Sequence, residues 1–300
     1  MNQKPASRAL MEPLRHSGST TQAQARKFNF VTERYAQIGE PLNLRGRSRA
    51  WFAEIFERQS LPARSLALVL GATPWIASML RRALDHTTLV DINPGMLDTA
   101  RAEISPSDDG AAGTVELIEA NWLALPALRA PIAIAVGDNS FSFVRHPEEW
   151  RLLCDALADR MHPGATLMAR FLTLPLGRPT TVAEIIEQSL GASDINYTAL
   201  RTAMLFAGAS DDTFELYPAR AVEMFDAHRA DLAALFERCP CTPDNDLFAI
   251  ERWRESRAVL YAPPLAHVLD ALGRRFRVRD IHFGPFDMAE YFPLVVATRR

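Results

Sequence analysis

The 300-residue sequence contains only three cysteines, Cys154, Cys239 and Cys241. Cys239 and Cys241 are separated by one residue, which is too close for an ordinary disulfide, and no second pair is present to complete a zinc site. The seven histidines are scattered without the spacing of metal ligands. We therefore expect free structural thiols, no bound metal and a reducing, cytoplasmic location.

Long apolar runs and clusters of positive charge are also missing. No run approaches the roughly 20 residues that a membrane span needs, and the polar segment 1–21 has no apolar core of a signal peptide. The formal net charge of −3 and the pI near 6.2 argue against a nucleic-acid partner, because phosphate contacts need clustered Lys and Arg. Since 48% of the residues are hydrophobic, the chain has ample material for a folded core.

The first 61 residues are predicted to form a helical segment. Residues 1 to about 25 are polar, and apolar residues then recur at three- and four-residue spacing in two runs that are separated by Gly39-Glu40-Pro41. The first run comprises Phe28, Val31, Tyr35 and Ile38, and the second comprises Trp51, Phe52, Ile55 and Phe56.

Residues 62–174 alternate between short apolar runs and amphipathic runs. The expected strands are 66–70, 87–90, 115–118, 132–136 and 166–171, and the expected helices are 74–84, 94–104 and 147–161. Prolines at the starts of these helices support their boundaries. Strict alternation predicts a parallel sheet that helices cover on both faces.

The alternation stops at about residue 175 and resumes at 263. Helix-like segments at 182–190, 196–206, 218–236 and 247–260 indicate a helical insertion, 175–262, rather than an independent domain. Residues 263–300 then supply a helix at 265–276 and strands at 278–283 and 291–298. The short connection between these two strands, Gly284-Pro285-Phe286-Asp287, predicts an antiparallel pair.

The most informative motif lies where the first two strands end. The run Leu66–Leu70 ends at Gly71, and Asp91 follows twenty positions later, at the end of the second strand. In a βαβ unit, the glycine admits a close backbone approach and the acid binds ribose hydroxyls. This crevice is predicted to hold a nucleoside. The structural alternatives are an ordinary turn at Gly71 and a helix cap at Asp91.

Five segments together resemble class I S-adenosylmethionine (SAM) dependent methyltransferases of the small-molecule type. They are 68–74, 90–97, 119–122, 136–141 and the Pro-Gly turn in 161–167, and the resemblance covers residues 65–171. The resemblance implies an α/β fold: a Rossmann-like, seven-stranded, mostly parallel sheet with an antiparallel C-terminal strand. The resemblance to the small-molecule type in particular is carried by a variant first motif, Gly71-Ala72-Thr73-Pro74, together with Gly137-Asp138-Asn139-Ser140.

The resemblance implies SAM as the cofactor and assigns its site. The oxygen of Asn121 is expected to face the adenine amine, with Trp122 beside the base; the alternatives are a turn former and a core residue. Met96 is either an adenine neighbour or part of the helix packing. The full set of cofactor residues implied is Gly71, Ala72, Thr73, Asp91, Ile92, Met96, Asn121, Trp122, Gly137 and Asp138.

The first motif departs from the family pattern, because Val69 stands where an acid is common. The contact that this acid makes to the methionine amino group therefore needs another partner. Asp138, at the end of a strand, has three competing roles: a general base, an anchor for the amino group or the substrate, or a turn residue. We favour the anchor, because methyl transfer depends more on alignment than on proton removal.

Two further residues are candidates for the catalytic site. Tyr35 lies on the N-terminal segment, which in such enzymes folds over the cofactor; it is either a core or lid residue or a direct contact. Arg170 is a charge in an apolar strand, and it either faces a solvated edge or holds an acceptor carboxylate. Four aromatic residues of the insertion are either walls of the acceptor pocket or core residues: Tyr197, Phe206, Phe214 and Tyr217.

The sequence therefore predicts a SAM-dependent methyltransferase that moves a methyl group to an O, N or S atom of a small molecule. One alternative is a nicotinamide-dependent oxidoreductase, but 72–76 lacks the later glycines of the dinucleotide fingerprint. The chain also lacks the Tyr-x-x-x-Lys pair of such oxidoreductases, because its lysines are only Lys4 and Lys27. Another alternative is a non-catalytic protein with this fold. The partners considered are the small-molecule acceptor and a second copy in a homodimer.

Overall fold

The computed structural model describes residues 40–62, 65–104, 113–190, 197–238, 250 and 253–300. Tyr35, Cys239, Cys241 and the predicted helical run 28–38 lie outside the described residues. The helices are α3 (Gly46–Glu57), α4 (Pro74–Ala83), α5 (Pro94–Glu103), α6 (Glu148–Arg160), α7 (Val182–Leu190), α8 (Tyr197–Ala207), α9 (Pro218–Ala227), α10 (Arg229–Arg238) and α12 (Leu265–Gly273).

Nine strands form two sheets among these residues. They are β1 (Leu66–Leu70), β2 (His86–Asp91), β3 (Thr114–Glu119), β4 (Ile132–Asp138), β5 (Met161–Arg170), β6 (Glu215–Leu216), β7 (Leu260–Tyr261), β8 (Phe276–His282) and β9 (Leu294–Arg299). Short 3-10 turns stand at η2 (Trp122–Ala124), η3 (Ser140–Phe143) and η4 (Ala289–Tyr291).

The large sheet has seven strands in the order β3-β2-β1-β4-β5-β9-β8. Strands β1 to β5 are parallel, and β9 runs antiparallel to both β5 and β8. The order reverses between β1 and β4, and in such a sheet ligands bind outside the carboxyl ends of the strands at this point. The predicted Rossmann-like α/β fold with its antiparallel C-terminal strand is confirmed.

Helices cover both faces of this sheet, as the run of fully buried residues in β1 requires. Leu66, Leu68 and Leu70 pack with α6 and α12 on one face. Ala67 and Val69 pack with α3, α4 and α5 on the other face. The alternation of side chains along β1 thus holds two separate cores together.

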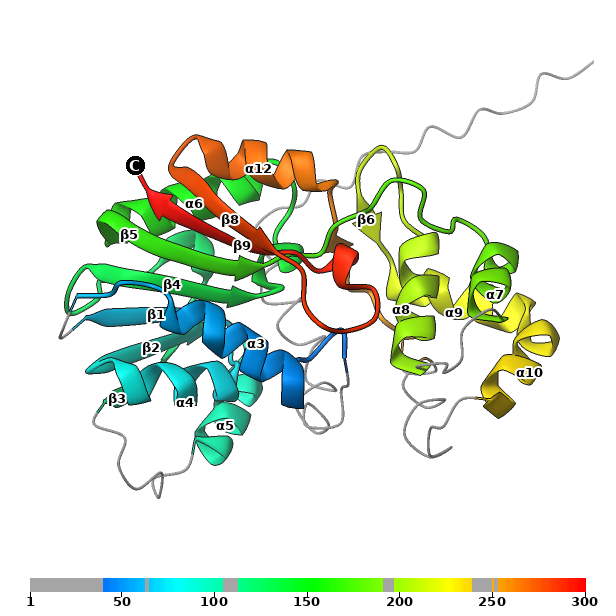
Figure 1. Cartoon of the computed structure of the whole chain (residues 1–300), viewed down its shortest axis with the longest axis horizontal. Helices are drawn as coiled ribbons and strands as arrows, with labels where there is room; N and C mark the ends of the chain where they lie inside the picture. The colour runs from blue at the N-terminus through cyan, green and yellow to red at the C-terminus, as the bar shows by residue number, and fades with distance from the viewer. Residues whose placement is uncertain (1–39, 63–64, 105–112, 191–196, 239–249, 251–252) are drawn as a thin grey trace, which may run out of the picture.

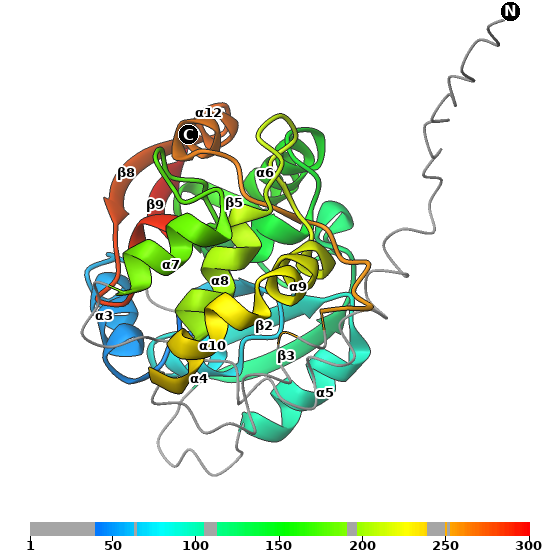
Figure 2. The ribbon, with the colours of Figure 1, turned by 90° about the vertical axis from the view of Figure 1, so that its right-hand side faces the viewer.

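The insertion between β5 and α12 forms a third core from α7, α8, α9 and α10. Leu172 and Leu174 after β5, and Tyr291 and Phe292 before β9, belong to this core and join it to the sheet. Figures 1 and 2 show the insertion helices beyond the ends toward which the β4 and β5 arrows point. The insertion therefore stands at the edge of the sheet where ligands bind in this fold class.

Some sequence predictions about individual elements are wrong. The predicted helix 218–236 is two helices, because α9 ends at Ala227, His228 follows it as the C-cap, and α10 starts at Arg229. Of the predicted helix 247–260, the described part after Ile250 consists of turns and the start of β7. β5 starts at Met161 and includes the predicted turn 162–164, with a register shift against β4 between Ile132 and Ile134.

No helix in the described part of the chain is both long enough and apolar enough to cross a membrane.

Candidate functional site

Gly71 lies at the carboxyl end of β1 in a backbone conformation that favours glycine, with φ of 98°. A Cβ atom there would lie 3.6 Å from Trp122 Cζ2, 3.8 Å from Asp91 Oδ2 and 3.9 Å from Ser140 Oγ. Side chains from three neighbouring strand ends therefore surround one bare backbone position. We refer to Gly71, Asp91, Trp122 and Ser140 as the Gly71 crevice.

Asp91 ends β2 and is held by backbone donors. Its Oδ2 accepts from the Ala72 amide at 2.9 Å, and its Oδ1 accepts from the Asn93 amide at 2.8 Å. Burial is the largest influence on this carboxyl and raises its pKa, although the backbone hydrogen bonds act in the opposite direction. Each carboxylate oxygen has a second lone pair, so both can still accept a ligand hydroxyl.

The cap of α5 is Asn93 rather than Asp91. The Asn93 side chain accepts from the amides of Gly95 and Met96, at 2.9 and 3.2 Å. The alternative that Asp91 merely caps this helix is therefore wrong, since that position is already filled.

Asn121 and Trp122 follow β3. Asn121 Oδ1 accepts from the Leu123 amide at 3.0 Å and so caps η2. Trp122 Nε1 donates to the Val90 carbonyl at 2.6 Å, which fixes the indole beside the end of β2. Trp122 thus belongs to the Gly71 crevice and also packs against the core on the α6 side.

The β4 tip contributes Gly137, Asp138, Asn139 and Ser140. Asn139 has φ of 59°, a left-handed conformation, and turns the chain directly into η3. Ser140 Oγ donates to the Leu70 carbonyl at 2.5 Å, which ties η3 to the end of β1. A Cβ at Gly137 would lie only 3.1 Å from Ser140 Oγ, so glycine permits this close approach.

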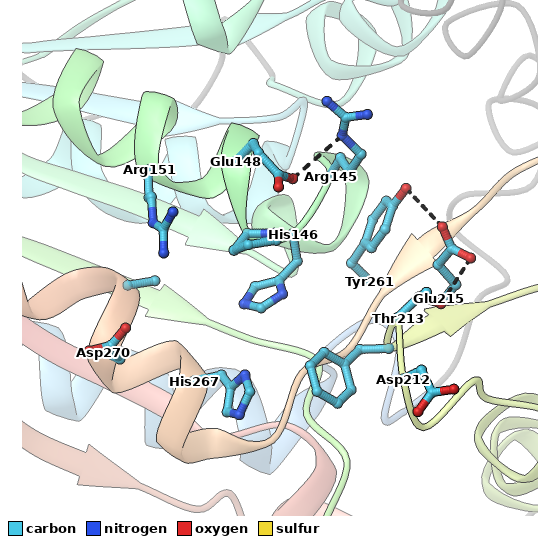
Figure 3. Close-up of a pocket in the computed structure, with 13 residues that line it drawn as sticks. Arg145, His146, Glu148, Arg151, Asp212, Thr213, Glu215, Tyr261, His267 and Asp270 are labelled. Carbon is cyan, nitrogen blue, oxygen red and sulfur yellow. Dashed lines mark hydrogen bonds and ion pairs between the residues drawn. The ribbon is translucent and has the colours of Figure 1, made fainter. Parts of the chain in front are cut away.

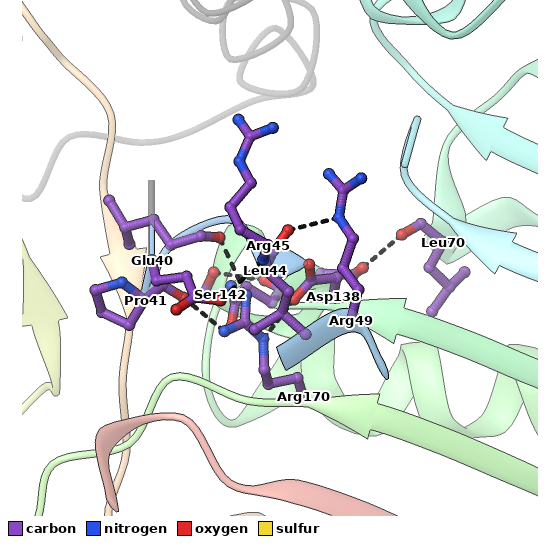
Figure 4. A network of polar contacts seen from close by, with 12 residues as sticks. Glu40, Pro41, Leu44, Arg45, Arg49, Leu70, Asp138, Ser142 and Arg170 are labelled. Atoms are coloured by element: carbon purple, nitrogen blue, oxygen red, sulfur yellow. Dashed lines mark hydrogen bonds and ion pairs between the residues drawn. The ribbon is translucent and has the colours of Figure 1, made fainter. Parts of the chain in front are cut away.

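Arg170 pairs with Asp138 across neighbouring strands, because the two residues are in register on β5 and β4. Its Nε donates to Asp138 Oδ1 at 2.6 Å, and the Arg170 side chain is 0% exposed. Figure 4 shows the guanidinium between Asp138 and the chain before α3. The alternative that Arg170 faces a solvated edge is wrong, and its guanidinium is occupied by protein atoms rather than turned toward an acceptor carboxylate.

The remaining predicted residues lie around the same strand ends. Ala72 and Thr73 are buried in the turn before α4, and the Thr73 amide donates to the Gly71 carbonyl at 3.0 Å. Ile92 and Met96 are half-buried beside Asp91, and Met96 packs against the α3–α5 core. The structure thus brings the described cofactor candidates to one edge of the sheet.

Sequence reasoning missed the role of Ser140. Ser140 belongs to the motif that starts at Gly137, but only the fold shows that its hydroxyl bridges the ends of β4 and β1 beside Gly71. The link between Asp138 and Arg170 was also missed, since their strands are separated in sequence by α6.

A second concavity, of about 570 Å³, opens between the insertion and the core. Figure 3 shows residues that line it, from the start of α6, from α12 and from the β6 and β7 strands. The ring centroids of His146 and His267 are 5.8 Å apart. The ring centroid of Phe214 lies 5.7 Å from that of His146 and 5.0 Å from that of His267. We call this concavity the His146 cleft.

The His146 cleft carries opposite charges around its aromatic centre. Burial, and secondarily the proximity of His267, lowers the pKa of His146 below 6.5, which favours the neutral imidazole. Glu215 Oε2 accepts from Tyr217 Oη at 2.6 Å, and the partial burial of this tyrosine together with the hydrogen bond raises the pKa of Tyr217 to about 12. β7 packs against η3, which starts at Ser140 in the Gly71 crevice and ends at Phe143, two residues before Arg145 in the cleft lining.

The four residues of the insertion that are expected as pocket walls lie in different environments. Phe214 lines the His146 cleft, whereas Phe206 is buried against Tyr291 and Phe292 in the insertion core. Tyr217 is exposed at the surface, and the side chain of Tyr197 lies outside the described residues.

Comparisons with known proteins support the fold. No protein-family model and no curated protein sequence matches this chain. A SAM-dependent methyltransferase structure from Methanosarcina mazei matches with a TM-score of 0.52 and 14% identity, covering 86% of this chain and 99% of the other. A magnesium protoporphyrin IX methyltransferase from Synechocystis, with bound S-adenosylhomocysteine, matches with a TM-score of 0.53 and 12% identity, covering 94% and 100%.

A Rhodobacter sphaeroides protein named as a candidate zinc-dependent alcohol dehydrogenase also matches, with a TM-score of 0.57 and 17% identity, covering 93% of this chain and 98% of the other. Likeness at this level of identity concerns the fold, and function has to be argued from the site. The chain has the Rossmann-like fold that is shared by SAM-dependent methyltransferases.

Proposed function

We propose that this chain is a SAM-dependent methyltransferase that acts on a small molecule. The observation that carries the proposal is the Gly71 crevice, in which a bare glycine backbone is bordered by a carboxylate, an indole and a hydroxyl. It lies where the strand order reverses, which is the ligand-binding edge of such sheets.

The residues present fit the cofactor. A substitution at Gly71 would place a Cβ within 4 Å of three side chains, so the glycine leaves space for a ligand to approach the backbone. The free lone pairs of Asp91 suit the two hydroxyls of a ribose, and Trp122 offers an apolar ring beside them. SAM, when bound, supplies a methyl group on a positively charged sulfonium.

Asp138 is proposed to anchor the cationic amino group of the cofactor. Arg170 is its partner on Oδ1, and among the described residues no hydrogen bond to Oδ2 is found. Oδ2 is thus the oxygen that can accept from an ammonium. This role compensates for Val69, which stands where the resemblance leads one to expect an acid.

The acceptor is proposed to bind on the insertion side of the crevice. The His146 cleft lies between insertion and core, and η3 connects it with Ser140 in the crevice. Transfer by in-line displacement then depends on the alignment that these walls impose.

A thermal-shift comparison tests the proposal. SAM and S-adenosylhomocysteine should each raise the unfolding temperature of the wild-type chain, since a ligand at 100 times its Kd stabilises by about 2.7 kcal/mol. NADH should not. Stabilisation by NADH alone would favour an oxidoreductase. An unfolding temperature that none of the three compounds changes would contradict the proposal.

A further inference from the structure

Arg170 is fully buried, yet it carries a charge that is costly to remove from water. Each guanidinium nitrogen donates to a protein oxygen: Nε to Asp138 Oδ1 at 2.6 Å, Nη1 to the Pro41 carbonyl at 2.5 Å and Nη2 to the Leu42 carbonyl at 3.1 Å. The rings of Phe286 and Phe292 lie 5.8 and 5.3 Å from the guanidinium carbon.

These bonds join parts of the chain that are far apart in sequence. The two carbonyls belong to residues 40–45, which we call the N-terminal strap, and they lie 129 and 128 positions from Arg170. The strap is fixed at its own ends as well. Glu40 Oε1 accepts from the Arg45 amide at 2.9 Å, and Arg49 Nε donates to the Leu44 carbonyl at 2.7 Å (Figure 4).

Stability alone does not account for this arrangement. Replacing a buried ion pair by apolar residues of similar volume is often neutral or stabilising. The planar fork of the guanidinium, in contrast, fixes three acceptors in one geometry, which the point charge of a lysine does not do. Arg170 therefore sets the position of Asp138 and of the strap relative to each other.

We propose that Arg170 is a positioning residue that couples the N-terminal strap to the cofactor site. It holds Asp138 through Oδ1 so that Oδ2 faces the ligand, and it clamps the strap against the same strand tip. The inference rests on the proposed function for its ligand, whereas the coupling itself can be measured without any ligand.

The test compares Arg170→Lys with Arg178→Lys as a matched control. Arg178 also joins an ion pair to Asp211 and a carbonyl contact to Phe206, but it does so within the insertion. Native-state hydrogen exchange is followed at the amides of Leu42 to Arg45 without ligand. S-adenosylhomocysteine affinity and, where an acceptor is known, KM and kcat are then measured.

In Arg170→Lys, the strap amides should exchange about tenfold faster while core strands keep their protection, the scale of a local opening that is cheaper by ~1.4 kcal/mol. Affinity should fall about tenfold, with KM for SAM affected more than kcat. Arg178→Lys should change neither property.

Unchanged strap protection, uniformly faster exchange throughout the protein, or a loosened strap with normal affinity would each overturn the coupling. If Arg170→Lys does not fold, Asp138→Asn decides: the amide oxygen still accepts from Arg170 Nε, but the charge that holds the guanidinium at the strand tip is lost, so the strap should loosen. A wild-type protein without SAM or S-adenosylhomocysteine binding would refute the proposed function alone, since the ligand-free exchange arm would still report on the strap.

Discussion

At the scale of single residues, Gly71 combines a backbone constraint with a spatial one. Its φ of 98° is unfavourable for any residue with a Cβ, and the space beside it is bordered by Asp91, Trp122 and Ser140. The two constraints have separable consequences, because backbone strain affects stability whereas an added methyl group also affects a ligand.

Gly71→Ala should therefore lower both stability and cofactor affinity. The left-handed conformation should cost roughly 1–2 kcal/mol of unfolding free energy. Gly164→Ala is the control, since Gly164 has φ of 78° with nothing within 4 Å of its Cβ position. Denaturant unfolding should show similar losses in both variants, but calorimetry should show weakened S-adenosylhomocysteine binding only in Gly71→Ala. Normal binding by Gly71→Ala would remove the crevice from the account.

Asp138 allows its two proposed chemical roles to be separated. If it anchors the amino group, Asp138→Asn should weaken SAM binding by about 1.5–3 kcal/mol, the worth of a hydrogen bond to a charged group, and turnover should fall with it. Asp155→Asn is the control, because Asp155 also pairs with an arginine, Arg275, away from the crevice. An Asp138→Asn protein that binds SAM normally but does not turn over would instead indicate a general base.

At the scale of elements, ring contacts among His146, His267 and Phe214 link the segment before α6, α12 and the insertion in the His146 cleft. The pKa of His146 in the folded state lies below the ordinary 6.5, with His267, Glu148 and Arg151 as its charged or titratable neighbours. At a pH between the folded-state pKa of His146 and the ordinary 6.5 of the unfolded chain, the unfolded chain binds more protons than the folded chain. Stability from this group is thus present above about pH 6.5 and is lost as the pH falls through the folded-state pKa.

His146→Phe should flatten the acid side of the stability profile while keeping the ring contacts to Trp150 and Phe214. The measurement is the thermal midpoint between about pH 5 and pH 7, where the wild type should lose stability on acidification. His162→Phe, at an exposed position of β5, is the control and should keep the wild-type slope. Parallel profiles for wild type and His146→Phe would contradict this interpretation of the cleft.

The sequence predicted those elements whose signal is local. Buried strands such as β1 and proline-initiated helices such as α4 have clear periodicity, and their predicted ranges agree closely with the structure. The break at His228 was missed because neither glycine nor proline marks it. The two-residue strands β6 and β7 were missed because their pairing joins residues 215–216 to 260–261, which no local pattern reveals.

The same division applies to the site. Gly71 and Asp91 could be predicted because each ends an apolar run at a recognisable interval. Arg170 could not be placed correctly, since its partners Asp138, Pro41 and Leu42 come from elsewhere in the chain. A lone charge in a strand has no signal in the sequence that distinguishes a buried pair from an exposed edge.

At the scale of the whole molecule, three cores meet at one edge of the sheet. Two cover the faces of the sheet, and the third belongs to the insertion and reaches the sheet through Leu172, Leu174, Tyr291 and Phe292. The crevice and the cleft lie at this junction, so a ligand there can be contacted by the sheet and by the insertion together. We propose that Asp91 binds the ribose of SAM or its product at this place.

Isothermal titration of S-adenosylhomocysteine into the wild-type chain and into Asp91→Ala tests this claim most directly. Wild type should bind, and the variant, still folded by circular dichroism, should bind more weakly by roughly 1–3 kcal/mol, because a charged acceptor for the ribose hydroxyls is lost. Equal affinity in the two proteins would contradict the claim.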